Sequence, residues 1–242
     1  MTDRSTPTLY LIPSSLSAGD PRLLLPAHAI AVAVTLDHFV AERAKTARSF
    51  LKAIGHRRPL RDIAIEELNE HTPAARIPEL LAPLRAGVSC GLLSEAGCPA
   101  IADPGAPLVL AAHRMGIRVQ PLVGPSAVLL ALMASGLPGQ RFAFHGYLPA
   151  AKAEREEQLK VLELESRRRR ETQIFIETPY RNLPLFESLL ASCGAQTWLC
   201  IASDLTGAAE HVSTRSIADW RRAAPPALAR LPTVFLLYAA DL

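Results

Sequence analysis

Short runs of β-forming residues alternate along this chain with amphipathic segments of helical length. Parallel neighbouring strands must be joined by a crossover of a dozen or more residues, so helices between strands favour a parallel sheet. The alternation therefore predicts an α/β fold with a mostly parallel sheet in the first half of the chain. The predicted strands there are residues 8–13, 38–42, 62–68, 88–93 and 118–123, and the predicted helices are 28–36, 44–55, 73–87 and 107–116.

A second region begins at Gly124 and Pro125, where Ser126 is placed to cap the helix that follows. Its predicted strands are 142–148, 172–178, 197–203 and 233–240, and its predicted helices are 152–166, 184–192 and 216–222. At 242 residues the chain exceeds the usual domain size of roughly 100–150 residues. We therefore expect an N-terminal α/β domain over 1–123 and a C-terminal α/β domain over 124–242.

The composition is that of a globular chain with an aliphatic core, because 49% of the residues are hydrophobic and 20% are charged. No apolar run approaches the roughly 20 residues of a membrane span, and the first residues lack the pattern of a secretion signal. We expect a soluble cytoplasmic protein with no membrane partner. The net charge of +3 permits an acidic partner such as RNA without arguing for one. The four cysteines suggest neither a disulfide framework nor a zinc site, and no metal is expected.

The stretch SEAGCPAIADPGAP, residues 94–107, directly follows the apolar run VSCGLL. In open α/β sheets ligands bind beyond the carboxyl ends of the strands, which is where this stretch lies. Gly97 and Gly105 allow the backbone to approach a ligand or to adopt positive φ, and three prolines fix the loop in advance. Glu95 and Asp103 are acceptors that suit ribose hydroxyls or an ammonium group better than a phosphate. The alternative is a rigid turn that caps the next helix.

The sequence lacks the motifs of several common enzyme classes. It contains no GxxxxGK phosphate loop, no GxGxxG dinucleotide fingerprint, no GxSxG nucleophile elbow and no HExxH zinc motif. The common hydrolase and dehydrogenase functions are therefore disfavoured.

A series of motifs in one order resembles the tetrapyrrole methylase superfamily. The series begins with LLSEAGCPAIADPG and continues with IRVQPLVGPSAVLLALMASGLPGQRFAFHGYLP. The motifs ELNE, IFIETPYR and SDLTGAAEHV, at residues 67–70, 174–181 and 203–212, extend the match over almost the whole chain. Within the superfamily the chain is most similar to the bacterial enzymes that 2′-O-methylate a cytidine ribose in small-subunit ribosomal RNA.

The resemblance implies a two-domain α/β enzyme, usually a homodimer, with a mixed sheet in its C-terminal domain. It also implies that S-adenosylmethionine binds in a cleft between the domains. By motif position, residues 94–105 contact the cofactor on one side. The start of the helix that follows Gly124 and Pro125 contacts its methionine part, and two residues of the C-terminal domain complete the site. The cofactor-binding residues implied in this way are Ser94, Glu95, Ala96, Gly97, Cys98, Pro99, Ile101, Asp103, Gly105, Ser126, Ala127, Glu177 and Leu205.

Two segments depart from the pattern of those ribosomal RNA enzymes. SSLSA at residues 14–18 stands where they have TPIGN, and ERAKTAR at residues 42–48 stands where they have EDTRHTG. Glu95 and Cys98 also replace their usual Asp and Thr. Because both segments fall where substrate is expected to meet cofactor, the chain is alternatively a paralogue that methylates a tetrapyrrole or another small molecule. A non-catalytic protein that only binds the cofactor is a further alternative.

Methyl transfer from a sulfonium is an in-line displacement that needs no metal, whereas a ribose hydroxyl needs a base or an electrostatic partner. Side chains at or just after strand ends are candidates for these roles, with Glu42 or Glu67 as the proton acceptor. A carboxylate at such a position can instead cap a helix or form an ion pair. The candidate catalytic residues are Glu42, Lys45, Glu67 and Asn69, and the candidate substrate-binding residues are Arg48 and Arg181.

Cationic residues are concentrated in two segments. Seven lysines and arginines lie within residues 43–61, and residues 167–170 are four consecutive arginines. Each segment is either a solvated surface or a contact for RNA phosphates, and the second possibility predicts binding that weakens steeply with salt. Aromatic residues are sparse near the first segment, so stacking on unpaired bases is not evident there. With the resemblance, these features make ribosomal RNA the expected substrate.

Overall fold

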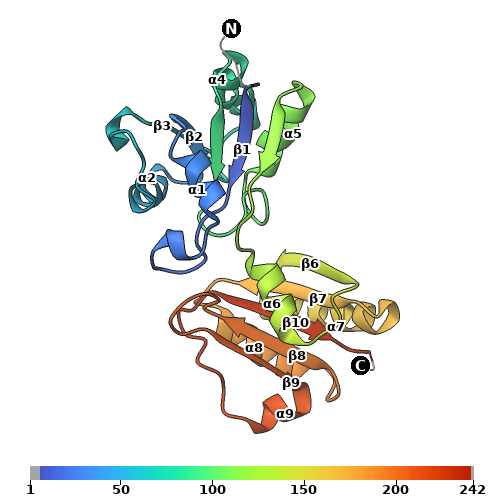
Figure 1. Ribbon diagram of the computed structural model, residues 1–242. Coiled ribbons are helices and arrows are strands. Elements are labelled where there is room, and N and C mark those ends of the chain that lie inside the picture. The colour runs from blue at the N-terminus through green and yellow to red at the C-terminus, as the bar shows by residue number, and fades with distance from the viewer. Residues whose placement is uncertain (1–5, 241–242) are drawn as a thin grey trace. The chain divides into compact units, whose positions relative to one another are not determined.

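The computed structural model describes residues 6–240 and is drawn in Figure 1. It divides into two compact units, the first ending at Ser126 and the second beginning at Ala127. The division falls a few residues after the boundary expected from the sequence. Each unit has a sheet of its own, with its own packed core.

The strands of the first unit form a parallel sheet in the order β3-β2-β4-β1-β5. Every neighbouring pair runs in the same direction, which the alternation of strands and helices predicts. The strand order makes β2, β4 and β1 consecutive, so their carboxyl ends are adjacent at one edge of the sheet. The strands are β1 (Thr8–Ile12), β2 (His38–Ala41), β3 (Ala64–Glu67), β4 (Cys90–Leu93) and β5 (Arg118–Pro121).

Helices cover both faces of this sheet (Figure 1). Successive strand residues point to opposite faces. In β2, Phe39 and Ala41 pack with residues of α1 and α2, whereas Val40 packs with residues of α3, α4 and α5. The central strands β1, β2 and β4 are therefore mostly apolar on both sides, which explains their continuous apolar sequences, whereas the edge strands β3 and β5 are largely exposed. The helices are α1 (Ala27–Ala33), α2 (Ala44–Ala53), α3 (Ile77–Leu80), α4 (Ala82–Arg85) and α5 (Ala106–Arg114), with 3-10 turns η1 (Pro21–Leu23), η2 (Leu60–Asp62) and η3 (Ala74–Arg76).

The single helix predicted over residues 73–87 is wrong. The segment contains η3 and then two separate four-residue helices, α3 and α4. A proline inside a helix lacks the N–H for the backbone ladder, and its ring clashes with the preceding turn. Pro83 lies in the first turn of α4, so the helix before it ends at Leu80 and a new one begins at Ala82. By contrast, the alanine-rich segment predicted as a helix over 28–36 is confirmed as α1.

The strands of the second unit form a mixed sheet in the order β6-β7-β10-β8-β9. β6 and β7 are parallel, and the other neighbouring pairs are antiparallel. The α/β class and the mixed sheet expected for this half are thus confirmed. Its core contains Leu159, Phe175, Leu189, Trp220 and Phe235. The elements are α6 (Ala127–Ser135), β6 (Phe142–Tyr147), α7 (Lys152–Arg169), β7 (Thr172–Glu177), α8 (Asn182–Ser192), β8 (Trp198–Ser203), β9 (His211–Ser216), α9 (Ile217–Arg222) and β10 (Thr233–Tyr238).

Strand β9 is an element that the sequence did not predict. Its sequence, HVSTRS, contains one aliphatic residue, Val212, and so lacks the apolar alternation of a half-buried strand. It lies at the edge of the sheet and pairs with β8, for instance through Leu199 and Arg215. Polar and charged residues on an edge strand discourage pairing with other chains.

Two features are absent from the part of the chain that the structure describes. Within residues 6–240, no helix has both the length and the apolar character needed to cross a bilayer. Among the same residues, no group of three or more histidine, cysteine, aspartate or glutamate side chains is placed to hold a metal ion.

Candidate functional site

Several predicted site residues of the first unit gather at the carboxyl-end edge of its sheet. Glu42 directly follows β2, Glu67 is the last residue of β3, and Ser94 directly follows β4. Because β2 lies between β3 and β4, the three residues come from consecutive strands. Lys45 and Arg48 lie nearby in the chain, at exposed positions of α2. This edge is where open α/β sheets bind their ligands.

Residues 94–105 form a loop whose first half is shaped by hydrogen bonds. Ser94 Oγ donates to the carbonyl oxygen of Gly97 at 2.9 Å. Gly97 and Ser14 exchange two backbone hydrogen bonds, of 2.9 and 3.2 Å. The loop is therefore anchored to the segment that follows β1 as well as to its own strand.

Asp103 shapes the second half of this loop. Its Oδ1 accepts a hydrogen bond from the Gly105 backbone N–H at 2.7 Å, and both carboxylate oxygens lie 2.9 Å from the Ala100 backbone nitrogen. Burial raises the pKa of Asp103, and the two N–H donors lower it. Ala100 and Ala102 have φ values of +66° and +58°, which costs a non-glycine residue roughly 1–3 kcal/mol each. Strain of this kind, held in place by a partly buried carboxylate, is typical of binding sites.

Gly97 has the positive φ that the sequence suggested for a glycine in this loop, and it packs closely against the protein's own atoms. Its φ of +73° lies in the region that favours glycine. A Cβ at this position would lie 3.1 Å from Leu16 Cδ2 and 3.4 Å from the Pro125 carbonyl oxygen. The thiol of Cys98 lies 3.4 Å from the same oxygen. Gly105 has an ordinary φ of −74° and is instead the N-cap residue of α5.

The other predicted cofactor residues of this region differ in exposure. Pro99 is buried, whereas Ala96 and Ile101 are exposed. Ser126 is the last residue of the first unit, and Ala127 is the first residue of α6. Their contacts with a cofactor stay predictions.

The carboxylate of Glu42 is affected by the negative charge of Glu95. Burial raises the pKa of Glu42, and the negative charge of Glu95 raises it further. The positive charge of Arg43 lowers this pKa in part, and Asp103 and Glu70 make smaller upward contributions. No residue between 6 and 240 donates a hydrogen bond to the Glu42 carboxylate. Glu95, by contrast, accepts a hydrogen bond from the hydroxyl of Thr46, a residue that the sequence did not single out. Glu42 therefore has an increased proton affinity and an available carboxylate.

Glu67 and Asn69 have structural partners. Glu67 Oε1 accepts a hydrogen bond of 2.8 Å from the backbone N–H of Ala44, the first residue of α2. The N-cap residue Arg43 makes no side-chain capping bond, so Glu67 caps the helix from the neighbouring strand. Asn69 Oδ1 accepts a hydrogen bond of 3.0 Å from the His71 backbone N–H within a turn. For Glu67 this is the capping role that the sequence left open as an alternative.

In the second unit, Glu177 and Arg181 form an ion pair. Glu177 is the last residue of β7, and its Oε1 accepts from Arg181 Nη2 at 2.7 Å and from the Thr178 backbone N–H at 2.6 Å. Its Oε2 is buried and has no hydrogen-bond partner among the described residues. Leu205, in the loop after β8, is buried. The predicted contacts of these residues with cofactor and substrate stay predictions.

Comparison with known proteins identifies relatives over most of the chain. Residues 11–220 match the sequence pattern of the tetrapyrrole (corrin/porphyrin) methylases. The chain is 34% identical over 218 residues to a ribosomal RNA small subunit methyltransferase I of Escherichia coli O157:H7, covering 90% of this chain and 72% of the relative. It is 38% identical over 216 residues to the protein of the same name from Xylella fastidiosa strain Temecula1, covering 88% and 74%. The crystal structure of the methyltransferase CobJ has a similar fold, with a TM-score of 0.63 and 18% identity over 97% of this chain and 94% of that chain. The resemblance expected from the motifs is confirmed.

Proposed function

Because the chain belongs to the tetrapyrrole methylase family, we propose that it methylates ribosomal RNA of the small subunit at a ribose 2′-hydroxyl. Members of this family are methyltransferases that use S-adenosylmethionine, so the enzyme class and the cofactor expected from the sequence are confirmed. The choice of ribosomal RNA rests on relatives of 34% and 38% identity that bear this substrate in their names. A homodimer and a cytoplasmic location belong to the same proposal.

The residues at the strand ends fit a cationic cofactor. S-adenosylmethionine carries positive charge on its sulfonium and its amino group. Glu42, Glu95 and Asp103 are close enough for the charges of the other two to raise the pKa of Glu42, and a bound cation would relieve this repulsion. The absence of a Cβ at Gly97 lets the bend of the loop pack against Leu16 and the Pro125 carbonyl, which fixes the shape of the loop. We assign Ser94, Glu95, Gly97, Cys98 and Asp103 to the wall that would hold the cofactor.

The proton of the ribose hydroxyl needs an acceptor within the protein. S-adenosylmethionine, when bound, would supply an electrophilic methyl group whose bond to sulfur breaks as the group is transferred, leaving S-adenosylhomocysteine. As the new bond forms at O2′, the O2′–H bond breaks and its proton passes to a carboxylate. Glu42 suits this role better than Glu67, because Glu67 is engaged by the first turn of α2 and Glu42 has an available carboxylate. Its raised pKa makes Glu42 a stronger base than an exposed glutamate. Lys45, in the first turn of α2, would stabilise the negative charge that develops on oxygen.

The first test is calorimetric titration of the protein with S-adenosylmethionine and with S-adenosylhomocysteine. We expect micromolar binding that is lost in Gly97→Val, because the new side chain would press on Leu16 and on the Pro125 carbonyl. Gly116→Val is the matched control, since Gly116 also has positive φ, +67°, but has no atom within 4 Å of an added Cβ. The control is expected to retain binding.

The second test is methyl transfer to small-subunit ribosomal RNA from a strain that lacks this protein. We expect incorporation by the wild-type protein. No incorporation by a protein that binds the cofactor would contradict the RNA substrate. No binding of the cofactor would contradict the assignment of the loop.

A further inference from the structure

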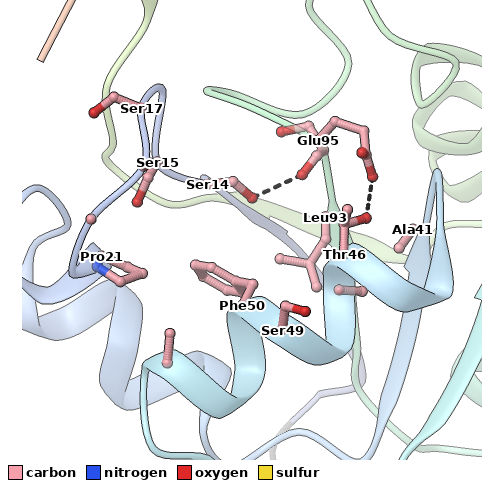
Figure 2. Close-up of a pocket in the computed structure, with 15 residues that line it drawn as sticks. Ser14, Ser15, Ser17, Pro21, Ala41, Thr46, Ser49, Phe50, Leu93 and Glu95 are labelled. Carbon is pink, nitrogen blue, oxygen red and sulfur yellow. Dashed lines mark hydrogen bonds between the residues drawn. The ribbon is translucent and has the colours of Figure 1, made fainter. Parts of the chain in front are cut away.

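A pocket of about 580 Å³ lies in the first unit, between the segment after β1 and helix α2 (Figure 2). Its volume falls within the roughly 300–1,000 Å³ of small-ligand sites. In Figure 2, Ser14, Ser15 and Ser17 lie on one side of the pocket, and Ser49 and Phe50 of α2 lie on the other. The pocket therefore lies between SSLSA and ERAKTAR, the two segments in which this chain departs from the ribosomal RNA enzymes that it resembles.

Helix α2 presents three faces to different surroundings. Positions three, four and seven apart share one side of a helix. One face is buried in the core, a second lines the pocket, and a third is exposed and cationic. By this spacing the pocket-lining face and the cationic face are adjacent at Ser49, so the pocket borders the cationic face. The buried face contains Ala47, which also lines the pocket, and Leu51. The pocket face contains Thr46, Ser49, Phe50 and Ala53, and the cationic face contains Lys45, Arg48 and Lys52.

The pocket combines an aromatic ring with hydroxyl groups. Phe50 is partly exposed, and an aromatic face is what proteins use to stack an unpaired base. Ser15 Oγ is buried and has no hydrogen-bond partner among the described residues. Buried polar atoms are nearly always hydrogen-bonded, so this hydroxyl points to a ligand that would pair with it. The hydroxyls of Thr46 and Ser49 donate within the protein, to Glu95 and to the Lys45 carbonyl, so their oxygens can accept from the N–H or O–H groups of a base or a ribose.

The pocket reaches the end of β2 and the start of the cofactor loop without covering the rest of that loop. Of the loop 94–105, Ser94 and Glu95 line the pocket, whereas 96–105 do not. Ala41, the last residue of β2, also lines it, and the next residue is Glu42. A methyl acceptor must reach both the cofactor and the base. The position of the pocket suits the acceptor better than the cofactor itself.

We infer that this pocket holds the acceptor nucleotide of an unpaired RNA strand, with its base against Phe50, while Lys45, Arg48 and Lys52 bind the neighbouring phosphates. The inference rests on the proposed function and adds the place where the substrate binds. An unpaired nucleotide is required because a base within a duplex does not expose its face for stacking.

Filling the pocket tests the inference. Ser49→Leu and Ala53→Leu each add bulk at exposed positions of α2 and use a good helix former, so the fold is expected to persist. The probe is fluorescein-labelled oligocytidine of about 12 nucleotides, within the roughly 4–16 that a single-strand-binding domain covers. We expect each variant to weaken binding about tenfold, as loss of one stacked base would. Affinity for S-adenosylmethionine is expected to stay within about twofold. Ala153→Leu, at an exposed position of α7, is the matched control.

Removing the cationic face tests the second half of the inference. The variant Lys45→Gln/Arg48→Gln/Lys52→Gln is expected to lower the salt dependence of oligocytidine binding, with the slope of log K against log salt falling by about 0.7 for each phosphate that is no longer neutralised. The control Arg85→Gln/Arg114→Gln/Arg118→Gln removes the same charge. Its residues are exposed at the end of α4, the end of α5 and the start of β5, away from the carboxyl ends of the strands. The control is expected to keep the wild-type slope.

Each contrary outcome identifies what has failed. Unchanged oligocytidine binding in both leucine variants would overturn the assignment of the pocket. If the wild-type protein bound a blunt RNA duplex as tightly as oligocytidine, the requirement for an unpaired nucleotide would be wrong. Loss of S-adenosylmethionine binding in the leucine variants would show that the pocket binds the cofactor and not the acceptor nucleotide. If the wild-type protein transfers no methyl group to ribosomal RNA, the proposed function itself fails, whatever the variants do.

Discussion

The hydroxyl of Ser14 donates a hydrogen bond of 2.9 Å to the carbonyl oxygen of Ser94. Ser14 follows β1 closely and is buried, and Ser94 directly follows the neighbouring strand β4. Both residues line the pocket. The bond therefore ties the SSLSA segment to the start of the cofactor loop, so that a change in one shifts the other.

Replacing Ser14 by alanine tests this connection. We expect Ser14→Ala to lower the free energy of unfolding by about 1 kcal/mol, because it removes one partly buried hydrogen bond. Urea denaturation measures the change. Ser49→Ala is the control, since the Ser49 hydroxyl is exposed and bonds at 3.2 Å to the Lys45 carbonyl of its own helix. A loss in Ser14→Ala no larger than in the control would mean that the bond does not anchor the loop.

Glu42→Gln is expected to lower kcat by about 10²–10⁴, which is the usual contribution of a general base. The wild-type protein should lose activity on the acid side, because the carboxylate must be ionised to accept a proton. Since burial and Glu95 raise the pKa of Glu42, this loss should begin at a higher pH than for an exposed glutamate. The pH profile of kcat at saturating substrates measures it.

Glu95→Gln is the companion variant for the pH profile. It removes the negative charge that raises the pKa of Glu42 and keeps an acceptor for the Thr46 hydroxyl. The acid limb of kcat should therefore move to lower pH. If the acid limb of the kcat profile persists in Glu42→Gln, or does not shift in Glu95→Gln, the proton acceptor is another group.

Glu67 is expected to act on stability rather than on proton transfer. Glu67→Ala removes the acceptor of the Ala44 N–H and should cost about 0.5–2 kcal/mol, as loss of an N-cap does. Glu67→Gln keeps an oxygen at that position and should recover most of the stability and the activity. Denaturation and kcat are measured for both variants. A glutamine variant as inactive as Glu42→Gln would make Glu67 the base instead.

The sequence predicted those elements of the fold whose residues are strongly apolar. β1, β4, β7 and β10 have a buried residue at most positions, so their runs stand out. β9 was missed because HVSTRS lies on a sheet edge and buries little. The break between α3 and α4 was missed because Pro83 interrupts an otherwise regular apolar spacing. In both segments the local sequence pattern favours one secondary structure, and the position of the segment in the fold or a single proline produces another.

The candidate site was predicted in its position but not in its contacts. Strand ends and motif order indicated Glu42, Glu67 and the loop 94–105. Only the fold shows that the Glu67 carboxylate caps α2 and that the Glu42 carboxylate accepts no hydrogen bond from the described residues. Both facts depend on contacts between segments that are distant in the sequence. Phe50 was also missed, since its spacing of three residues from Ala47 and four from Ile54 fits a core residue as well as a pocket wall.

The strained backbone of the loop leads to a prediction about Ala100. With φ of +66°, Ala100 carries strain of roughly 1–3 kcal/mol, whereas the added freedom of a glycine costs about 0.5–1 kcal/mol. Ala100→Gly should therefore raise the free energy of unfolding, by between about 0 and about 2.5 kcal/mol. The same substitution at Ala111, inside α5, should lower it by about 1 kcal/mol and serves as the control.

The effect of Ala100→Gly on cofactor affinity should be opposite to its effect on stability. Asp103 holds Ala100 by two contacts of 2.9 Å, so the loop is fixed in its shape before a ligand arrives. A glycine widens the conformations of the free loop, and binding must then restrict them. We expect S-adenosylmethionine to bind less tightly to a protein that is more resistant to urea. If stability and affinity rise together in this variant, the strain serves no purpose in binding, and the loop is only a turn that caps α5.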